Sequence, residues 1–139
     1  MSQRLVKNLL YEDLTYKIQG CFYTVYNTLG FGHKEVVYQK ALAKEFKKRE
    51  ISFETEKALP IFYLGEEVGV YRPDFVIEGK VIVEVKSMKF LPREAEEQLI
   101  HYLKGTDFKL GFLVNFGTKR LEIKRKIWSK NLRKSAINQ

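Results

Sequence analysis

Cysteine is almost absent from the sequence, with Cys21 the single example in 139 residues. One thiol excludes an intramolecular disulfide, a cysteine-ligated zinc site and an iron–sulfur cluster, because each of these needs several thiolates. Cys21 stands among Ile18, Phe22 and Val25 at helical spacing. This pattern predicts a buried and unreactive thiol.

Long apolar runs are also missing, and none approaches the roughly 20 residues that a transmembrane helix needs. The first residues, MSQRLVKNLLYEDL, contain no uninterrupted apolar core and no small-residue cleavage site, so we expect no signal peptide. Internal repeats, low-complexity segments and linkers rich in Pro, Gly or Ser are absent as well. We therefore expect a cytoplasmic protein that does not bind membranes.

Acidic residues are scarce only at the end of the chain. The net charge is +8, and from Lys119 onward eight basic residues stand against one acid, Glu122. A basic segment of this kind attracts phosphate backbones without reading their sequence, or it is a solvated tail. The hydrophobic content of 45% is sufficient for a core. We expect one domain over residues 1–127 and a basic tail over residues 128–139.

Hydrophobic periodicity predicts an α/β domain. Apolar residues recur every three or four positions in three segments, which predicts helices there. The second of these helices is expected to bury Val37, Leu42 and Phe46. The predicted helices span residues 14–29, 34–49 and 93–104. Between and after them the period changes to two, which predicts strands over residues 51–57, 59–64, 68–77, 80–86, 108–116 and 121–127, with an interruption at Pro73. This order favours a single mixed β-sheet flanked by helices.

The most informative segment is Pro73-Asp74, nine further residues, and then Glu84-Val85-Lys86. Glu84 and Lys86 are two apart, so both project from one face of their strand. The turn at residues 78–80 decides where Asp74 lies. A two-residue loop places Asp74 opposite Val83, whereas a three-residue loop with Gly79 at positive φ pairs Asp74 with Glu84. We predict the three-residue loop.

Two carboxylates paired in this way destabilise each other unless a cation lies between them. Oxygen ligands favour Mg²⁺ or Mn²⁺, held by Asp74, Glu84 and the backbone carbonyl of Val85. Lys86 beside the metal could orient or deprotonate the attacking water and neutralise a phosphate. The alternative is that Asp74, Glu84 and Lys86 are solvated charges on an ordinary hairpin.

A second motif stands at residues 32–38, GHKEVVY, followed by QKAL. With the leading TYKIQGCFYTVYNTLG and the trailing LGFLVNFG and LEIKR, it resembles the GxxExxY family of the PD-(D/E)xK nuclease superfamily over nearly the full length. The resemblance implies a restriction-endonuclease-like fold and a metal-dependent nuclease with Asp74, Glu84 and Lys86 in the active site. The superfamily commonly adds a helical acid to the metal site, and this role falls on Glu35. The alternative for Glu35 is a first-turn acid favoured by the helix dipole. His33 is expected to be a loop residue.

Gln98 and Tyr102 are four apart and share one helical face. The segment is similar to the QxxxY motif of RecB-type exonucleases, which implies that both side chains support catalysis near the nucleic acid. The alternative is an amphipathic helix with a surface Gln and a half-buried Tyr. The cysteines of the iron–sulfur relatives are missing.

Basic residues outside the catalytic set are candidates for nucleic-acid binding. Phe90 or Tyr71 could stack on an exposed base, although we expect both in the core. The candidate basic residues are Arg72, Lys89, Arg93, Lys124, Arg125 and Lys126.

Together these features favour a Mg²⁺-dependent deoxyribonuclease that acts on ends, single strands or branched structures. The first alternative is a non-catalytic nucleic-acid-binding module with a nuclease fold that acts within a complex. A generic interaction domain with a basic tail is the second. Homodimerisation is possible for a nuclease of this size, because two subunits can engage both strands.

Overall fold

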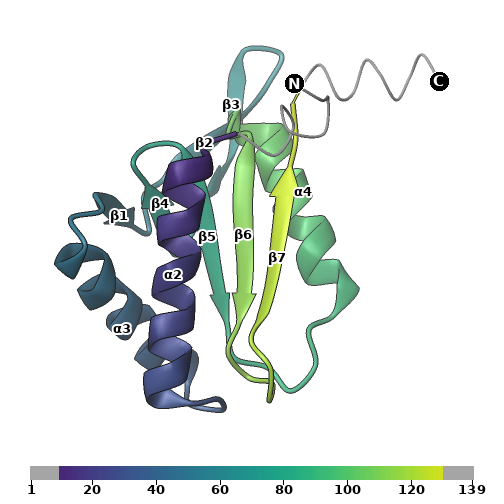
Figure 1. Cartoon of the computed structure of the whole chain (residues 1–139). Helices are drawn as coiled ribbons and strands as arrows, with labels where there is room; N and C mark the ends of the chain where they lie inside the picture. Colours follow the sequence, from purple (N-terminus) through teal and green to yellow (C-terminus); the bar gives the residue numbers. More distant parts are fainter. Residues whose placement is uncertain (1–9, 130–139) are drawn as a thin grey trace, which may run out of the picture.

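A five-stranded mixed β-sheet forms the centre of the protein (Figure 1). The computed structural model describes residues 10–129. β5 and β6 run parallel, and the remaining neighbours in the sheet are antiparallel. In their order across the sheet, the strands are β1 (Phe53–Thr55), β4 (Phe75–Ile77), β5 (Val81–Lys86), β6 (Leu110–Asn115) and β7 (Glu122–Ile127).

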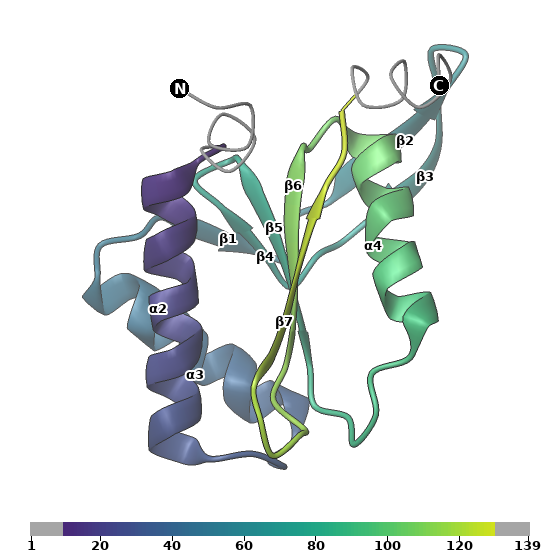
Figure 2. The ribbon, with the colours of Figure 1, turned by 45° about the vertical axis from the view of Figure 1, so that its right-hand side comes forward.

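Helices cover both faces of this sheet (Figure 2). The helices α2 (Glu12–Leu29) and α3 (Glu35–Lys48) pack on one face, and α4 (Arg93–Thr106) packs on the other. α4 is the crossover between the parallel strands β5 and β6, which such a pair requires. The predicted α/β class with a mixed sheet between helices is therefore confirmed.

The sheet separates two apolar cores. Val81, Val83 and Val85 of β5 point toward α2 and α3 and are fully buried, as the alternation of the strand predicts. Ile82 points the other way, into a smaller core that includes Leu99 of α4. Because helices cover both faces, the central strands read as nearly continuous apolar runs.

Two predicted strands lie outside the main sheet, so the expectation of one sheet was wrong in this respect. β2 (Leu59–Tyr63) and β3 (Glu66–Tyr71) form a separate two-stranded antiparallel sheet. Pro73 lies in the break between β3 and β4, where a residue without an N–H cannot continue a ladder. The turn of this hairpin is at Leu64 and Gly65, and β3 begins at Glu66, two residues before the strand predicted from residue 68.

The inward face of α3 also differs from the prediction. Val37 is exposed, whereas Tyr38 is fully buried. Tyr38, Leu42 and Phe46 are spaced by four and make up the buried face of this helix. The large ring of Tyr38 is buried because its hydroxyl finds backbone partners, which are described below.

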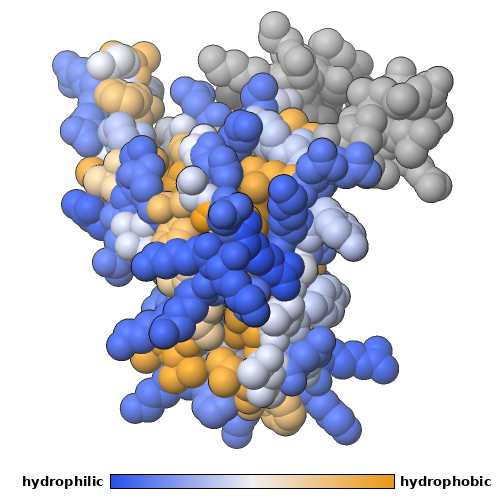
Figure 3. All heavy atoms as spheres, turned by 60° about the vertical axis from the view of Figure 1, so that its left-hand side comes forward, coloured by the Kyte–Doolittle hydropathy of each residue, from blue (hydrophilic) through white to orange (hydrophobic). Residues whose placement is uncertain are grey.

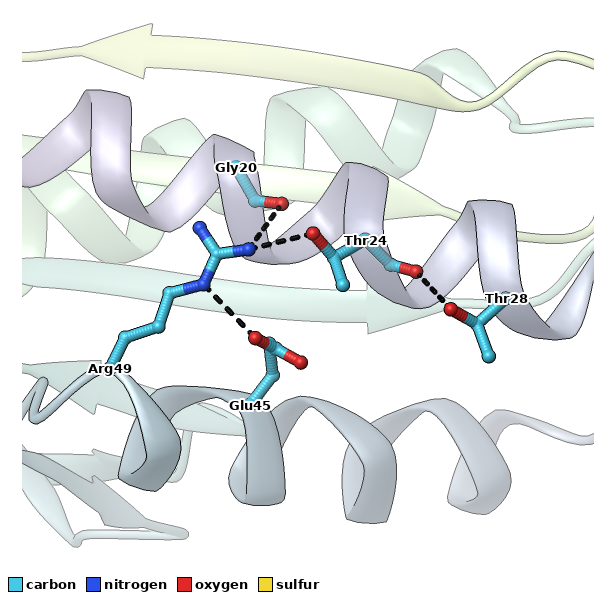
Figure 4. Close-up of polar contacts among 5 residues, drawn as sticks. All are labelled: Gly20, Thr24, Thr28, Glu45 and Arg49. Atoms are coloured by element: carbon cyan, nitrogen blue, oxygen red, sulfur yellow. Dashed lines mark hydrogen bonds and ion pairs between the residues drawn. The ribbon is translucent and has the colours of Figure 1, made fainter.

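A polar contact joins α2 and α3 outside the core (Figure 4). The Arg49 guanidinium donates to Glu45 Oε2 at 3.0 Å and to Thr24 Oγ1 at 2.7 Å. This contact ties the end of α3 to the middle of α2. Figure 3 shows the side of the molecule on which these helices lie, where hydrophilic side chains are interspersed with apolar ones.

Cys21 is fully buried, and burial raises the pKa of its thiol to about 11. The predicted buried position of this cysteine is confirmed, and a thiol with a raised pKa is mostly protonated near neutral pH, which favours the predicted low reactivity. Across residues 10–129, no helix combines the length and the apolar character needed to cross a membrane.

Candidate active site

The β4–β5 hairpin brings Asp74 to Glu84. Ile77 pairs with Val81, so the connection contains three residues, 78–80, and the predicted register is confirmed. Glu78 and Gly79 adopt positive φ angles of 54° and 65°. One step beyond the last ladder pair, this register sets Asp74 opposite Glu84.

Each carboxylate is held by the backbone beside the other. Glu84 Oε1 accepts a hydrogen bond from the Asp74 N–H at 2.8 Å. Asp74 Oδ2 accepts one from the Val85 N–H at 2.7 Å. Gln39 of α3 donates from Nε2 to Asp74 Oδ1 at 3.1 Å. These bonds fix both side chains. The role of Gln39 was not predicted, because its only signal in the sequence is its place directly after the GxxExxY motif.

Burial makes both carboxyl groups poor acids. Burial, followed by the charge of Asp74, raises the pKa of Glu84 to about 7. Burial also raises the pKa of Asp74, and the hydrogen bonds from Val85 and Gln39 oppose this shift. Both groups therefore ionise at a cost that a nearby cation would reduce.

Lys86 stands two residues after Glu84 and emerges on the same face of β5. Its positive charge lowers the pKa values of Asp74 and Glu84, although less than burial raises them. The Lys86 side chain borders a hollow between the end of β5 and α4. The predicted trio thus lies on one face of the sheet, near the carboxyl end of the central strand β5.

The residues of the GxxExxY segment fasten the start of α3 to the end of β6. The Tyr38 hydroxyl donates to the Gly30 carbonyl at 2.7 Å and accepts from the His33 N–H at 3.1 Å. The Tyr38 ring stacks on Phe116 with 4.3 Å between ring centroids. The Gly32 N–H donates to the Phe116 carbonyl at 3.1 Å, at a φ of 91° that favours glycine. His33 lies in the loop before α3, as expected.

This anchorage sets Glu35 in the first turn of α3, on the side of Asp74 and Lys86. Neighbouring protein atoms partly shield Glu35 from water and raise its pKa, with Lys86 opposing the shift and Asp74 adding to it. Its side chain is exposed. In the part of the chain that the structure describes, no three His, Cys, Asp or Glu side chains gather closely enough to hold a metal ion. A ligand role for Glu35 therefore stays a prediction.

Gln98 and Tyr102 share a face of α4, and Gln98 Nε2 donates to the Tyr102 hydroxyl at 3.2 Å. The Tyr102 ring stacks almost parallel on Tyr71, with 3.6 Å between centroids and 5° between planes. Tyr71 is 4% exposed, and its hydroxyl has no partner of regular hydrogen-bond geometry. The charge of Glu84, after burial, raises the pKa of that hydroxyl. Tyr71 thus connects the QxxxY-like segment to Glu84.

A match to a family model decides the identity of this fold. The model describes the PD-(D/E)XK nuclease superfamily and matches residues 12–126. The chain belongs to the PD-(D/E)XK nuclease superfamily. Among solved structures, the crystal structure of SSO0001 is similar at 23% identity and a TM-score of 0.47, over 95% of this chain and 69% of that chain. A likeness at this level adds nothing to the assignment. No curated protein matches the chain.

PD-(D/E)XK nucleases typically use divalent metal ions such as Mg²⁺, and the donors at this site have the chemistry for such an ion. Asp74 and Glu84 offer carboxylate oxygens, and the backbone carbonyl of Val85 stays the predicted third donor. Mg²⁺ is commonly held by one or two carboxylates and keeps several waters, so it does not need a third acidic side chain. The raised pKa values of both carboxyl groups are those of a site that a cation would stabilise.

A buried amide positions the loop after Lys86, and sequence reasoning missed it. Asn115 is fully buried at the end of β6. Its Oδ1 accepts from the N–H groups of Met88 at 2.9 Å and Gly117 at 3.0 Å. Its Nδ2 donates to the Met88 carbonyl and to Glu122 Oε1, both at 3.0 Å. The amide thereby clamps the loop that follows Lys86.

The candidate nucleic-acid-binding residues do not form one patch. In the pairing of β7 with β6, Lys124 and Lys126 lie on the face of α4, and Arg125 lies on the opposite face. Lys126 forms an ion pair with Glu96 at 2.8 Å, and Arg125 donates to the Leu10 carbonyl at 3.4 Å.

The other basic candidates are exposed. Arg93 lies at the start of α4 and forms an ion pair with Glu97 at 3.5 Å. Arg72 and Lys89 are exposed in loops on either side of the hairpin that carries the carboxylates. Most of the predicted basic tail, including Lys130, Arg133 and Lys134, lies outside the described residues.

The two aromatic candidates for base stacking differ from each other. Tyr71 is buried, as expected, but Phe90 is 78% exposed, so the expected core position of Phe90 was wrong. Phe90 lies in the loop between β5 and α4. No neighbouring element of the described structure covers it.

Proposed function

We propose that this protein is a metal-dependent nuclease that hydrolyses phosphodiester bonds in DNA, at ends, in single strands or in branched structures. The observation that carries the proposal is the reciprocal bonding of Asp74 and Glu84, each held by a backbone N–H beside the other. In each carboxylate, some oxygen lone pairs accept hydrogen bonds that fix the direction of the group. The remaining lone pairs are available to a ligand. Charges on an ordinary solvated hairpin would not be buried and fixed in this way.

In this proposal Asp74, Glu84 and the Val85 carbonyl hold Mg²⁺ or Mn²⁺, with Glu35 as a further acid at the start of α3. The bound ion would supply Lewis acidity, which makes a water more acidic and stabilises charge that develops on the phosphate. Lys86 orients or deprotonates the attacking water and neutralises the phosphate with its ammonium group. Gln98 and Tyr102 support the site through Tyr71.

Finer assignments belong to the same proposal. The hydrogen bonds of Gly32 and Tyr38 support membership of the GxxExxY family, because the glycine and the tyrosine of that motif both hold the start of α3 in place. We also place the nuclease domain at residues 1–127, in a protein that acts in the cytoplasm. Homodimerisation would allow two such sites to engage both strands of a duplex.

The experiment is a cleavage assay with the purified full chain. Labelled single-stranded, duplex and branched DNA, and RNA of the same sequence, are incubated with Mg²⁺, Mn²⁺ or a chelator. We expect metal-dependent cleavage of DNA that is lost in Asp74→Asn and Lys86→Gln. Lys80→Gln is the matched control, because Lys80 lies in the turn at the other end of the same hairpin. This variant should cut DNA as the parent does.

Two results would contradict the proposal. One is that no substrate is cut under any metal condition. The other is that Asp74→Asn and Lys86→Gln cut as well as the parent. Salt-sensitive binding of nucleic acid that does not depend on the carboxylates would instead support the non-catalytic module.

A further inference from the structure

A hollow of about 470 Å³ opens beside Lys86, between the loop after β5 and the first turns of α4. Its lining surface is largely apolar, and besides charged residues at its sides it includes two further polar side chains. The residues that give it this character are Met88, Pro92, Ala95, Gln98 and His101. Gln98 donates to Tyr102 through Nε2, which leaves its Oε1 to accept further bonds.

The charge of the hollow argues against a phosphate inside it. Glu94 and Glu97 line its α4 side, and a phosphate placed there would be repelled. Lys86 is the cation of its rim, and Lys89 is exposed in the adjoining loop. A phosphate is therefore favoured on the side of the lysines, while a neutral, flat group is favoured in the hollow.

The loop that forms one wall also presents an aromatic ring. Phe90 is 78% exposed and lies between Met88 and Pro92, which both line the hollow. Met88 itself is 38% exposed. The Asn115 amide holds this loop through both the N–H and the carbonyl of Met88, so the loop is positioned by a buried partner. Exposed apolar side chains at a fixed place beside a reactive site indicate a contact surface.

We propose that this hollow and Phe90 bind an unpaired nucleobase of the substrate strand, next to the phosphate that Lys86 faces. The inference rests on the proposed function, because it takes the ligand to be a nucleic acid. Aromatic rings stack on bases without strong sequence preference, and His101 and Gln98 can bond to a base edge. A base inside a duplex has both faces covered, so the site selects single strands, flaps or frayed ends.

The experiment measures binding in the presence of a chelator, so that no strand is cut. Fluorescence anisotropy compares a labelled 12-nucleotide thymidine strand with an abasic strand that has the same phosphates. Stacking of one base contributes about 1–3 kcal/mol, so we expect Phe90→Ala to bind the thymidine strand about 5- to 150-fold more weakly. Its affinity for the abasic strand should match that of the parent. Phe90→Trp should retain the affinity of the parent for both strands.

Tyr16→Ala is the matched control. Tyr16 is 81% exposed, similar to Phe90, but it lies on α2 on the opposite face of the sheet. Its loss should change neither affinity. The melting temperature of Phe90→Ala should match that of the parent, since Phe90 is exposed. Phe90→Leu is a second variant, and we expect its affinity for the thymidine strand to be intermediate.

Three outcomes would overturn the inference. Phe90→Ala could bind both strands like the parent, or it could lose the same affinity for the abasic strand as for the thymidine strand. It could also weaken binding to a blunt duplex as much as binding to the single strand. The binding test needs no hydrolysis, so its result is separate from that of the cleavage assay. A protein that cuts DNA but fails this test would lose only the inference.

Discussion

At the scale of single residues, the candidate site contains carboxyl groups whose pKa values are raised by burial. Glu84 has a pKa of about 7 in the folded protein, mainly through burial and then through Asp74. An ordinary glutamate in the unfolded chain titrates near 4.5. The folded state therefore binds this proton more tightly, and its contribution to stability is lost as the pH rises through about 7.

We predict that replacing Glu84 by Gln removes this loss. In chelator, the parent should lose roughly 2–3 kcal/mol of unfolding free energy between pH 5 and pH 8 from this group, and Glu84→Gln should not lose it. Urea unfolding at the two pH values measures the difference. Mg²⁺ should restore stability to the parent at pH 8 and leave the variant unchanged. Equal pH dependence of the two proteins would show that the pKa of Glu84 is not raised in the folded protein.

A second residue-scale prediction concerns Tyr71, whose hydroxyl is buried without a regular partner beside Glu84. We expect Tyr71→Phe to raise the Mg²⁺ or Mn²⁺ concentration for half-saturation by about 10- to 100-fold, the usual effect of losing a residue that supports a metal ligand. The midpoint is read from the metal-dependent shift in melting temperature, without an activity assay. Tyr102→Phe is the control, because it keeps the stacking on Tyr71 and loses only the bond to Gln98. An unchanged midpoint in Tyr71→Phe would exclude a positioning role.

At the scale of elements, the loop between β5 and α4 depends on one amide in β6. Asn115→Ala leaves the N–H and carbonyl of Met88 without their partner, and each buried polar group that loses its partner costs about 1–3 kcal/mol. We expect a loss of about 2–4 kcal/mol in urea unfolding, together with faster hydrogen exchange at the Met88 amide. Asn27→Ala, at an exposed position of α2, should change neither. Slow exchange at Met88 in Asn115→Ala would mean that other contacts hold the loop.

The periodicity of the sequence was sufficient to predict most elements and the β4–β5 hairpin that carries Asp74 and Glu84. The alternation of Val81, Val83 and Val85 requires Glu84 and Lys86 on the other face, and the three-residue turn follows from Gly79. Both are local relationships, so a single sequence contains them.

The missed features are contacts between distant segments. Tyr38 is buried instead of Val37 because the ring of Phe116, directly after β6, lies against it. The Asn115 clamp joins positions 27 residues apart, and the Gln39 bond to Asp74 joins positions 35 apart. Without an observed fold, no pattern at these positions distinguishes them from ordinary polar surface residues.

At the scale of the whole molecule, the sheet divides the positive charge. Arg125 faces α2, while Lys89 is exposed in the loop beside the candidate active site. Burial lowers the pKa of the Arg125 guanidinium, and its bond to the Leu10 carbonyl directs it into the protein. A net charge of +8 is therefore no guide to how many cations meet a phosphate backbone.

This division predicts different salt dependences for two variants. Each lysine or arginine that contacts a phosphate contributes about one unit to the slope of log affinity against log salt concentration. Lys89→Gln should lower the slope for DNA binding by about one, and Arg125→Gln should leave it unchanged. Anisotropy titrations between low and moderate salt provide both slopes. A smaller slope in Arg125→Gln would place DNA on the α2 face as well.

The contact of Gly117 with Met88 has a consequence for how such a protein can diversify. A Cβ at position 117 would lie 2.2 Å from the Met88 nitrogen, so the turn before β7 packs directly against the backbone of the loop after β5. Bulk or extra length added to this turn must therefore displace the neighbouring loop before it reaches the acidic hairpin. Under the proposed function, variation there would alter which nucleic-acid strands bind while Asp74, Glu84 and Lys86 keep their arrangement, and this offers a route to new targets with unchanged chemistry.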